Sequence, residues 1–261
     1  MKKKIVLLSV LFTAFVCLSA NPYKAEKYKE PKILISHESD HSLKSFALSE
    51  ENEEPEIPLE EKINKLYRKF ETLNTSMPSR VSFQYAMRGY YDLEEKGKLK
   101  NKILTIVDFS LASTEKRMWV LDMNDYSVLF NTVVAHGRGT GGNFAKNFSN
   151  VANSHKSSLG FYLTAETYIG KHGLSLRMDG LEKDINDNAR SRYIVIHGAD
   201  YATPGFAKRI GRLGRSYGCP SVPPKFSKKI INTIKEKSVF FIYYPSQKYL
   251  ETSTFLNTKT A

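Results

Sequence analysis

A histidine and a cysteine in the last third of the chain are the residues best suited to covalent chemistry. His197 ends the apolar run 193–196 and precedes Gly198, which is typical of the last residue of a buried strand. Cys219 follows Gly218 in a segment rich in glycine and arginine, which indicates a loop. An imidazole beside a thiol can take its proton and so produce a nucleophilic thiolate. We therefore predict that His197 and Cys219 form a catalytic pair.

The residues next to Cys219 can support this chemistry. Glycine lets the backbone bend sharply beside a nucleophile and point its N–H groups at a developing oxyanion. The amides of Cys219, Tyr217 and Gly218 are the candidate donors. Ser216 is placed to hydrogen-bond to the imidazole or to the substrate, so we add Ser216 and Gly218 to the catalytic set. Without catalysis, His197 would be a hydrogen-bonded polar residue at a strand end and Cys219 a small buried apolar residue.

The elements that position these residues predict a mainly β (α+β) domain. Helices are expected at 58–73, where apolar residues recur on one helical face, and at 82–95, which stops near Gly97. Strand-like runs lie at 103–109, 117–122, 128–135, 161–168 and 239–244, with a loop and strand at 170–180 and a helix around 226–234. Short strands separated by turn residues are typical of a predominantly β fold.

The first 20 residues have the layout of a secretory signal peptide. Lys2, Lys3 and Lys4 precede the apolar run 5–18, and small residues follow it. This run is shorter than the roughly 20 apolar residues that a membrane anchor needs. We expect cleavage after Ala20, export to the periplasm or cell envelope, and no stable membrane anchor.

Cleavage of the signal peptide would change both the number of cysteines and the net charge. Val16 stands before Cys17 where a lipobox wants a small residue, which disfavours lipidation. Loss of Cys17 leaves Cys219 unpaired in a compartment that favours disulfides, which marks its thiol as reactive. Removal of three lysines lowers the formal charge from +12 to +9. A basic exported protein attracts acidic partners, and nucleic acid is disfavoured.

Five stretches carry a resemblance to a known family: VVAHGRGTGGNFAKNFSN, SSLGFY, TYIGKHGLSLRMDGLE, INDNARSRYIVIHGADY and GRLGRSYGCPSVP. They are similar to the L,D-transpeptidase (YkuD-like) catalytic domain, and most of all to its larger-motif subfamily of murein L,D-transpeptidases. The likeness covers about 81–245. The chain departs from the commoner form of the family at Tyr217, where that form has His, and after Cys219, where it has an Arg. The separation between His197 and Cys219 is also longer.

The resemblance implies a mixed β-sandwich with flanking helices over 79–246, with the cysteine and histidine at one end. It implies an L,D-transpeptidase that acts on peptidoglycan stem peptides through a Cys219 thioester, without a cofactor or metal. It also implies that a backbone carbonyl orients His197. The loop of His172 would lie over the substrate cleft. We therefore predict a substrate-binding set of three residues, His172, Tyr217 and Arg215.

The remaining segments are expected to be peripheral. Acidic residues and prolines dominate the end of 21–57, which indicates a solvated linker, and the amphipathic helix that follows completes the segment 21–78. Packing of this helix on the domain is the favoured interpretation, with partner binding as the alternative. Residues 247–261 are polar, and we expect them to form a flexible tail.

Other chemistries use the same residues. A water acceptor would give L,D-carboxypeptidase activity, loss of turnover would leave a wall-binding module, and an ordinary cysteine endopeptidase shares the Cys/His pair. A metal site would need His136, His155, His172 and His197 to converge, yet their spacings match no helical His pair or zinc pattern. GRGTGG at 137–142 lacks the Lys-Ser/Thr ending of a phosphate loop and is interpreted as a turn.

Overall fold

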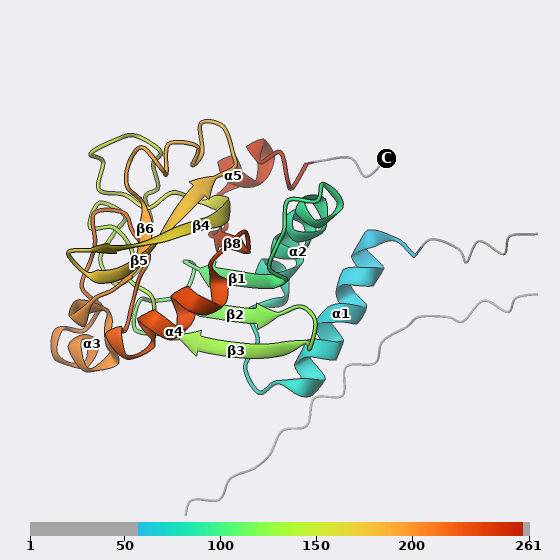
Figure 1. Ribbon diagram of the computed structural model, residues 1–261, viewed down its shortest axis with the longest axis horizontal. Helices are drawn as coiled ribbons and strands as arrows, with labels where there is room; N and C mark the ends of the chain where they lie inside the picture. The colour runs from blue at the N-terminus through green and yellow to red at the C-terminus, as the bar shows by residue number, and fades with distance from the viewer. Residues whose placement is uncertain (1–56, 258–261) are drawn as a thin grey trace, which may run out of the picture. The chain divides into compact units, whose positions relative to one another are not determined.

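The computed structural model describes residues 57–257 (Figure 1). Two helices precede the first strand: α1 (Leu59–Leu73) and α2 (Arg80–Glu95). The buried side chains of α1 recur every three or four residues, at Ile63, Tyr67 and Phe70. The predicted helices at 58–73 and 82–95 are confirmed, with α2 starting two residues early because the side chain of Ser79 caps it by accepting the Ser82 N–H.

In the described chain, eight strands form one hydrogen-bonded sheet in the order β3-β2-β1-β8-β4-β5-β6-β7. Their bounds are β1 (Ile103–Asp108), β2 (Met118–Asp122), β3 (Ser127–Thr132), β4 (Gly160–Gly170), β5 (Gly173–Gly180), β6 (Val195–Gly198), β7 (Ser221–Val222) and β8 (Val239–Tyr243). The pairs β1–β8 and β6–β7 are parallel and the others antiparallel, so the sheet is mixed. The predicted mainly β fold with flanking helices is confirmed.

The core lies where helices pack on the central strands. Phe161 of β4 stacks on Phe241 of β8, with ring centroids 4.2 Å apart. Gly89 lets α2 approach this stack, because a Cβ there would lie 2.2 Å from Cε1 of Phe161. Helix α4 (Pro224–Ile234) buries Ile230, Ile231 and Ile234 and contacts β6, β5 and β1. The short elements η1 (Asp200–Ala202) and α3 (Pro204–Ile210) follow β6.

Two predicted strands are shorter than expected. The strand ending at His197 begins only at Val195, because Tyr193 has a φ of 55° and closes a turn with its N–H on the carbonyl of Arg190. The run 128–135 leaves the strand after Thr132. Its end stays buried, and Ala135 forms an isolated bridge with Ser221.

The C-terminal segment differs from the expected flexible tail. It forms α5 (Gln247–Thr252), buries Tyr249 and Leu256, and hydrogen-bonds to the buried Glu182 through the Tyr249 and Ser253 hydroxyls. A polar sequence thus docks through a few well-placed side chains. The predicted signal peptide and the acidic linker to residue 56 lie outside the described residues. Within 57–257, no helix has the length and apolar character needed to cross a membrane.

Candidate active site

The sheet brings the segments of His197 and Cys219 to one edge. Strand β7, the last in the order, pairs in parallel with β6, and His197 lies opposite Ser221. Cys219 stands two residues before Ser221, in the loop that enters β7. Because parallel neighbours run side by side, backbone hydrogen bonds hold the end of β6 against β7, and the cysteine loop leads directly into β7. The catalytic role of the two residues stays a prediction.

The thiol of Cys219 is half-buried, and its Sγ donates a hydrogen bond to the Tyr193 carbonyl at 3.6 Å. Burial raises the pKa of the thiol above its ordinary value. The backbone N–H of Val195 and the guanidinium of Arg192 favour the thiolate, but their effect on the pKa is smaller than that of burial. The free protein therefore holds Cys219 as a neutral thiol at neutral pH.

The imidazole of His197 has both nitrogens engaged. Nδ1 lies 2.9 Å from the Gly198 carbonyl, which can only accept, so Nδ1 carries the hydrogen and Nε2 is the basic nitrogen. The Ser221 hydroxyl lies 3.0 Å from Nε2 and donates to it, and the Tyr201 hydroxyl lies 3.1 Å from Ser221 Oγ. Burial lowers the pKa of His197, and the nearby His172 and Lys171 lower it further. The imidazole is therefore a neutral base.

His172 lies on the exposed turn between β4 and β5 and covers the predicted catalytic histidine. Its ring stacks on that of His197, with centroids 4.4 Å apart and planes 18° apart. The β5–β6 register, in which Ser175 pairs with His197, holds the turn in this place. The predicted substrate contact of His172 is not tested by this geometry, which shows that the ring forms one wall around the imidazole.

Hydrogen bonds within the cysteine loop fix its backbone. Ser216 Oγ accepts the Gly218 N–H at 3.0 Å and donates to the Cys219 carbonyl at 2.7 Å. Gly218 has a φ of 128°, and its carbonyl accepts from Ser157 Oγ at 2.9 Å. The Gly218 amide is thus occupied, which leaves the amides of Tyr217 and Cys219 as the candidate oxyanion donors. Ser216 contacts the loop backbone, and the hydroxyl at the imidazole is that of Ser221.

Tyr217 and Arg215, the other predicted substrate contacts, lie on the exposed side of the loop. Arg215 Nη1 donates to the Gly141 carbonyl at 3.0 Å. Tyr217 packs against two residues that sequence reasoning did not assign to the site, Arg138 and His155. These contacts join residues that are dozens of positions apart in the sequence, so no local sequence pattern predicts them.

The histidines weighed as metal ligands do not converge. His136 is buried, and its Nδ1 accepts from Arg117 Nη2 at 2.8 Å, while burial lowers its pKa to about 3. His155 contacts Tyr217, and His172 contacts His197. No group of three or more His, Cys, Asp or Glu side chains among residues 57–257 is arranged to hold a metal ion.

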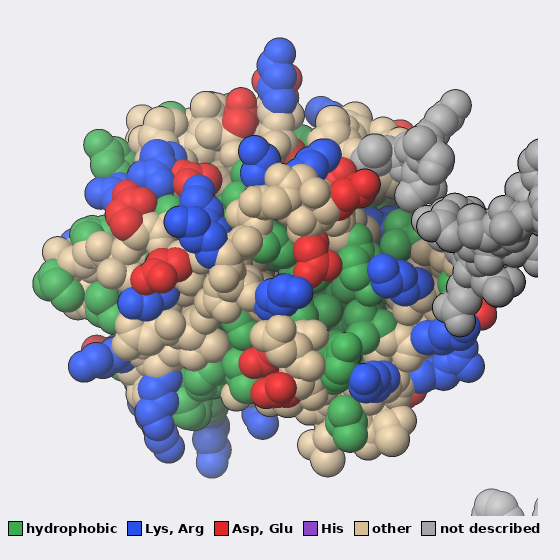
Figure 2. All heavy atoms as spheres, turned by 45° about the vertical axis from the view of Figure 1, so that its right-hand side comes forward, with side chains coloured by type: hydrophobic (Ala, Val, Ile, Leu, Met, Phe, Trp, Pro, Cys, Tyr) green, Lys and Arg blue, Asp and Glu red, His purple; other side chains and the backbone are tan. Residues whose placement is uncertain are grey.

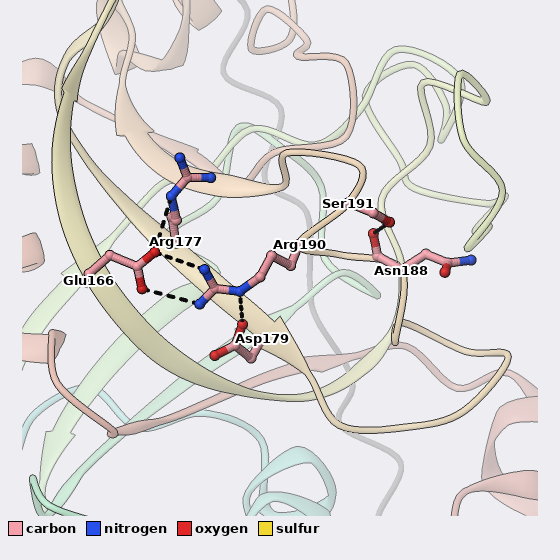
Figure 3. A network of polar contacts seen from close by, with 6 residues as sticks. All are labelled: Glu166, Arg177, Asp179, Asn188, Arg190 and Ser191. Atoms are coloured by element: carbon pink, nitrogen blue, oxygen red, sulfur yellow. Dashed lines mark hydrogen bonds and ion pairs between the residues drawn. The ribbon is translucent and has the colours of Figure 1, made fainter.

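A cavity of about 340 Å³ lies apart from these residues. It is lined by Lys100, Thr164, Ala165, Glu166, Asp179, Arg190, Glu236 and Lys237. Figure 3 shows a network on one side of this lining, in which Arg190 contacts both Glu166 and Asp179. None of the predicted site residues lines this cavity, so the network does not belong to the predicted active site.

The sequence profile of the L,D-transpeptidase catalytic domain matches residues 74–243, and the chain belongs to this family. Comparison with curated proteins gave no match. Among solved structures, the chain is similar to an L,D-transpeptidase from Mycobacterium smegmatis (12% identity, 55% of this chain and 59% of that chain, TM-score 0.34). It is also similar to L,D-transpeptidase 3 from Mycobacterium tuberculosis (11% identity, 55% of this chain and 61% of that chain, TM-score 0.35). A third similar structure is an L,D-transpeptidase from Stackebrandtia nassauensis (14% identity, 71% of this chain and 77% of that chain, TM-score 0.34). The chain thus spans about three fifths of the first two solved chains.

Proposed function

We propose that this chain is an exported L,D-transpeptidase that acts on peptidoglycan stem peptides through a thioester on Cys219. The observation that carries the proposal is the family match over 74–243, which includes both His197 and Cys219. The pairing of β6 with β7, which holds the two segments together, supports it. Export to the periplasm rests on the predicted signal peptide, and the catalytic unit is proposed to comprise residues 79–246.

The first half of the reaction forms the acyl-enzyme. The Ser221 hydroxyl turns away from Nε2 of His197, and this nitrogen takes the proton of the Cys219 thiol. The sulfur bonds to the carbonyl carbon of an L-centre in the donor stem, and the amides of Tyr217 and Cys219 stabilise the oxyanion. The C–N bond to the terminal D-residue then breaks. Its amine leaves with the proton held by the imidazolium, and a thioester remains.

The second half consumes the thioester. An amine of a second stem attacks the acyl carbon, a new C–N bond forms, and the C–S bond breaks. The proton lost by the amine passes through His197 back to the sulfur, so the enzyme is restored. Water in place of the amine would give L,D-carboxypeptidase activity. The products of the reaction distinguish the two activities.

The pKa values support proton transfer that accompanies attack. Burial holds the Cys219 thiol and the His197 imidazole in their neutral forms, so a stable thiolate–imidazolium pair is disfavoured before substrate binds. A bound carbonyl whose oxyanion is stabilised makes the charged forms accessible during the reaction. A reactive cysteine of this kind is also protected from oxidation at rest, because the thiolate is the form that reacts.

The test is to incubate the purified protein with a disaccharide tetrapeptide and identify the products by mass spectrometry. A crosslinked dimer is the expected product, and loss of the terminal D-residue alone would show carboxypeptidase activity. Cys219→Ala should abolish both reactions, while Lys228→Ala, an exposed change on α4, should leave them intact. Binding to sacculi without turnover would instead support a wall-binding module, and cleavage of casein would support an endopeptidase.

A further inference from the structure

The basic residues around the cysteine loop have no acidic partner within the described chain. The ion pairs of residues 57–257 lie on α1 and α2, between α2 and β1, on the β4–β5 side and within the pair at 235–236. None of them involves the basic residues that surround the loop, namely Arg138, Lys156, Lys171, Arg192 and Arg215. The positive charge at the loop is therefore available to an anion that comes from outside.

Arg138 is exposed, and its side chain is held through Nε and through the face of its guanidinium, whereas the exposed Arg215 is held through a terminal nitrogen, Nη1. The Nε of Arg138 donates to His155 Nδ1 at 3.1 Å, and its Cζ lies 4.7 Å from the centre of the Tyr217 ring. The rings of His155 and Tyr217 contact each other at 4.5 Å. The two terminal nitrogens of Arg138 make no hydrogen bond within the described chain. These two nitrogens form a fork that can bind both oxygens of a carboxylate. Because the guanidinium is already fixed through Nε and through its face, such binding needs little further ordering of the side chain.

Arg190 shows what an arginine of this chain does when carboxylates are within reach. It binds Glu166 through two parallel contacts of 2.8 and 3.1 Å and Asp179 through Nε at 2.5 Å (Figure 3). Arg138 uses its Nε for a histidine in a similar way but has no carboxylate on its fork. The open fork of Arg138 is the geometry with which Arg190 binds the Glu166 carboxylate.

Backbone contacts place Arg138 beside the predicted nucleophile. The Arg138 N–H donates to the Ser216 carbonyl at 2.8 Å, and a Cβ at the preceding Gly137 would lie 3.0 Å from Cα of Gly218. Tyr217, on which the guanidinium stacks, is two residues before Cys219. A group bound to the Arg138 fork would therefore lie close to a substrate attached to the sulfur.

We propose that Arg138, held by His155 and Tyr217, is the binding site for a free carboxylate of the donor peptide. This inference rests on the proposed function, and it names a feature of the substrate: the enzyme distinguishes a stem with a free internal carboxylate from one in which that group is amidated. A carboxamide keeps the shape but loses the charge and one acceptor oxygen, so it cannot accept two charge-assisted hydrogen bonds from the fork. Arg215 adds positive charge nearby.

The experiment compares two disaccharide tetrapeptides, one with its internal carboxylates free and one with them amidated, both keeping the terminal carboxylate. The wild-type enzyme should show a KM about tenfold lower for the acid peptide. Arg138→Gln should raise that KM by about tenfold while kcat stays within about twofold, and should leave the amidated peptide unaffected. Arg138→Lys, which keeps the charge without the fork, should restore part of the difference.

Matched variants distinguish loss of carboxylate binding from a nonspecific effect of the substitution on the fold. Arg209→Gln removes another exposed arginine that packs on an aromatic ring, that of Phe206, and should change neither KM. Tyr217→Phe keeps the ring under the guanidinium and should retain the preference, whereas Tyr217→Leu should weaken it. Equal KM values for the two peptides in the wild type would overturn the inference. So would a preference that survives Arg138→Gln.

Direct binding keeps this inference distinct from the proposed reaction. Titration calorimetry of Cys219→Ala with each peptide measures affinity without turnover. Tighter binding of the acid peptide, lost when Arg138→Gln is added, would support the carboxylate site even if the wild type proved inactive. Crosslinking of both peptides at equal efficiency would support the proposed function and reject the carboxylate site.

Discussion

The side chains of Cys219 and His197 are both shifted by burial towards their neutral forms, the thiol upward in pKa and the imidazole downward. This has a measurable consequence at the residue scale. The rate of Cys219 alkylation by iodoacetamide should keep rising through pH 8, because the thiolate forms only above the ordinary thiol pKa of about 8.5. A preformed thiolate–imidazolium pair would instead give a plateau at neutral pH.

The unfolded protein provides the reference for this measurement. Alkylation in denaturant, followed over the same pH range, gives the midpoint of an unperturbed thiol, and the native midpoint should lie above it. A native midpoint below the denatured one would contradict the neutral pair. Cys219→Ala should show no labelling at the loop, which assigns the signal to this residue.

Ser216 is expected to stabilise the cysteine loop rather than to exchange protons with the imidazole. Ser216→Ala removes the hydroxyl that accepts the Gly218 N–H and donates to the Cys219 carbonyl, so one buried and one part-buried backbone group lose this partner. The free energy of unfolding should fall by about 1–3 kcal/mol. Urea denaturation measures this loss.

A second serine provides the control for that substitution. Ser227→Ala removes one exposed hydrogen bond, to the Pro224 carbonyl, and should change the stability by less than about 0.5 kcal/mol. Equal effects of the two substitutions would show that the hydrogen bonds of Ser216 do not hold the loop.

At the scale of elements, the sequence predicted the helices and strands whose formation depends on a local pattern of residues. The helix at 58–73 follows from a single apolar face, and most strands follow from runs of β-branched and aromatic residues. The strand of His197 was predicted too long because its pattern does not reveal that Tyr193 adopts a positive φ. The sequence offered Ser216 as a hydrogen-bond partner of the imidazole or of the substrate, and it did not reveal that the Ser221 hydroxyl lies at His197, since that contact depends on the β6–β7 register.

The helix α5 was missed for a related reason, because its attachment depends on a partner far along the chain. Glu182 accepts hydrogen bonds from the Phe161 N–H at 2.7 Å and the Tyr249 hydroxyl at 3.2 Å, and it also binds the Ser253 hydroxyl. Polar residues near a C-terminus are usually exposed, so their composition suggested a tail. The buried carboxyl group of Glu182 gives them a common partner.

Glu182 should make the stability of the fold depend on pH. Burial raises the pKa of its carboxyl group above the unfolded value of about 4.3. Folding therefore favours the protonated form. The contribution of Glu182 to the free energy of unfolding is fully present below the unfolded pKa and is lost as pH rises through the folded pKa. Glu182→Gln should remove this decline, and urea denaturation at a series of pH values measures it.

A surface carboxylate serves as the control for the pH series. Glu95→Gln changes an exposed residue at the end of α2 and should keep the decline seen in the wild type. If Glu182→Gln shows the same pH dependence as the wild type, the buried carboxyl group does not titrate with folding. The attachment of α5 would then rest on its apolar contacts alone.

At the scale of the whole molecule, charge is arranged unevenly. The chain is strongly basic, with 39 Lys and Arg against 27 Asp and Glu. On the face shown in Figure 2, Lys and Arg side chains are interspersed with Asp and Glu, so much of the charge there lies near its opposite. Arg138 and Arg215, beside the cysteine loop, have no ion pair within the described chain. Part of the excess positive charge therefore lies beside the proposed substrate site, where it is available to an anion from outside.

This arrangement predicts a salt dependence that is specific to substrate charge. Exposed charges are screened over about 10 Å at 0.1 M salt, so raising NaCl from about 20 to about 500 mM should lower kcat/KM for the acid peptide several-fold. The amidated peptide has fewer negative charges and should lose much less. Arg138→Gln should flatten the response to the acid peptide, and Arg209→Gln should not. A parallel decline for both peptides would mean that salt acts on the fold or on the chemical step. The arginines beside the cysteine loop would then not select the substrate by its charge.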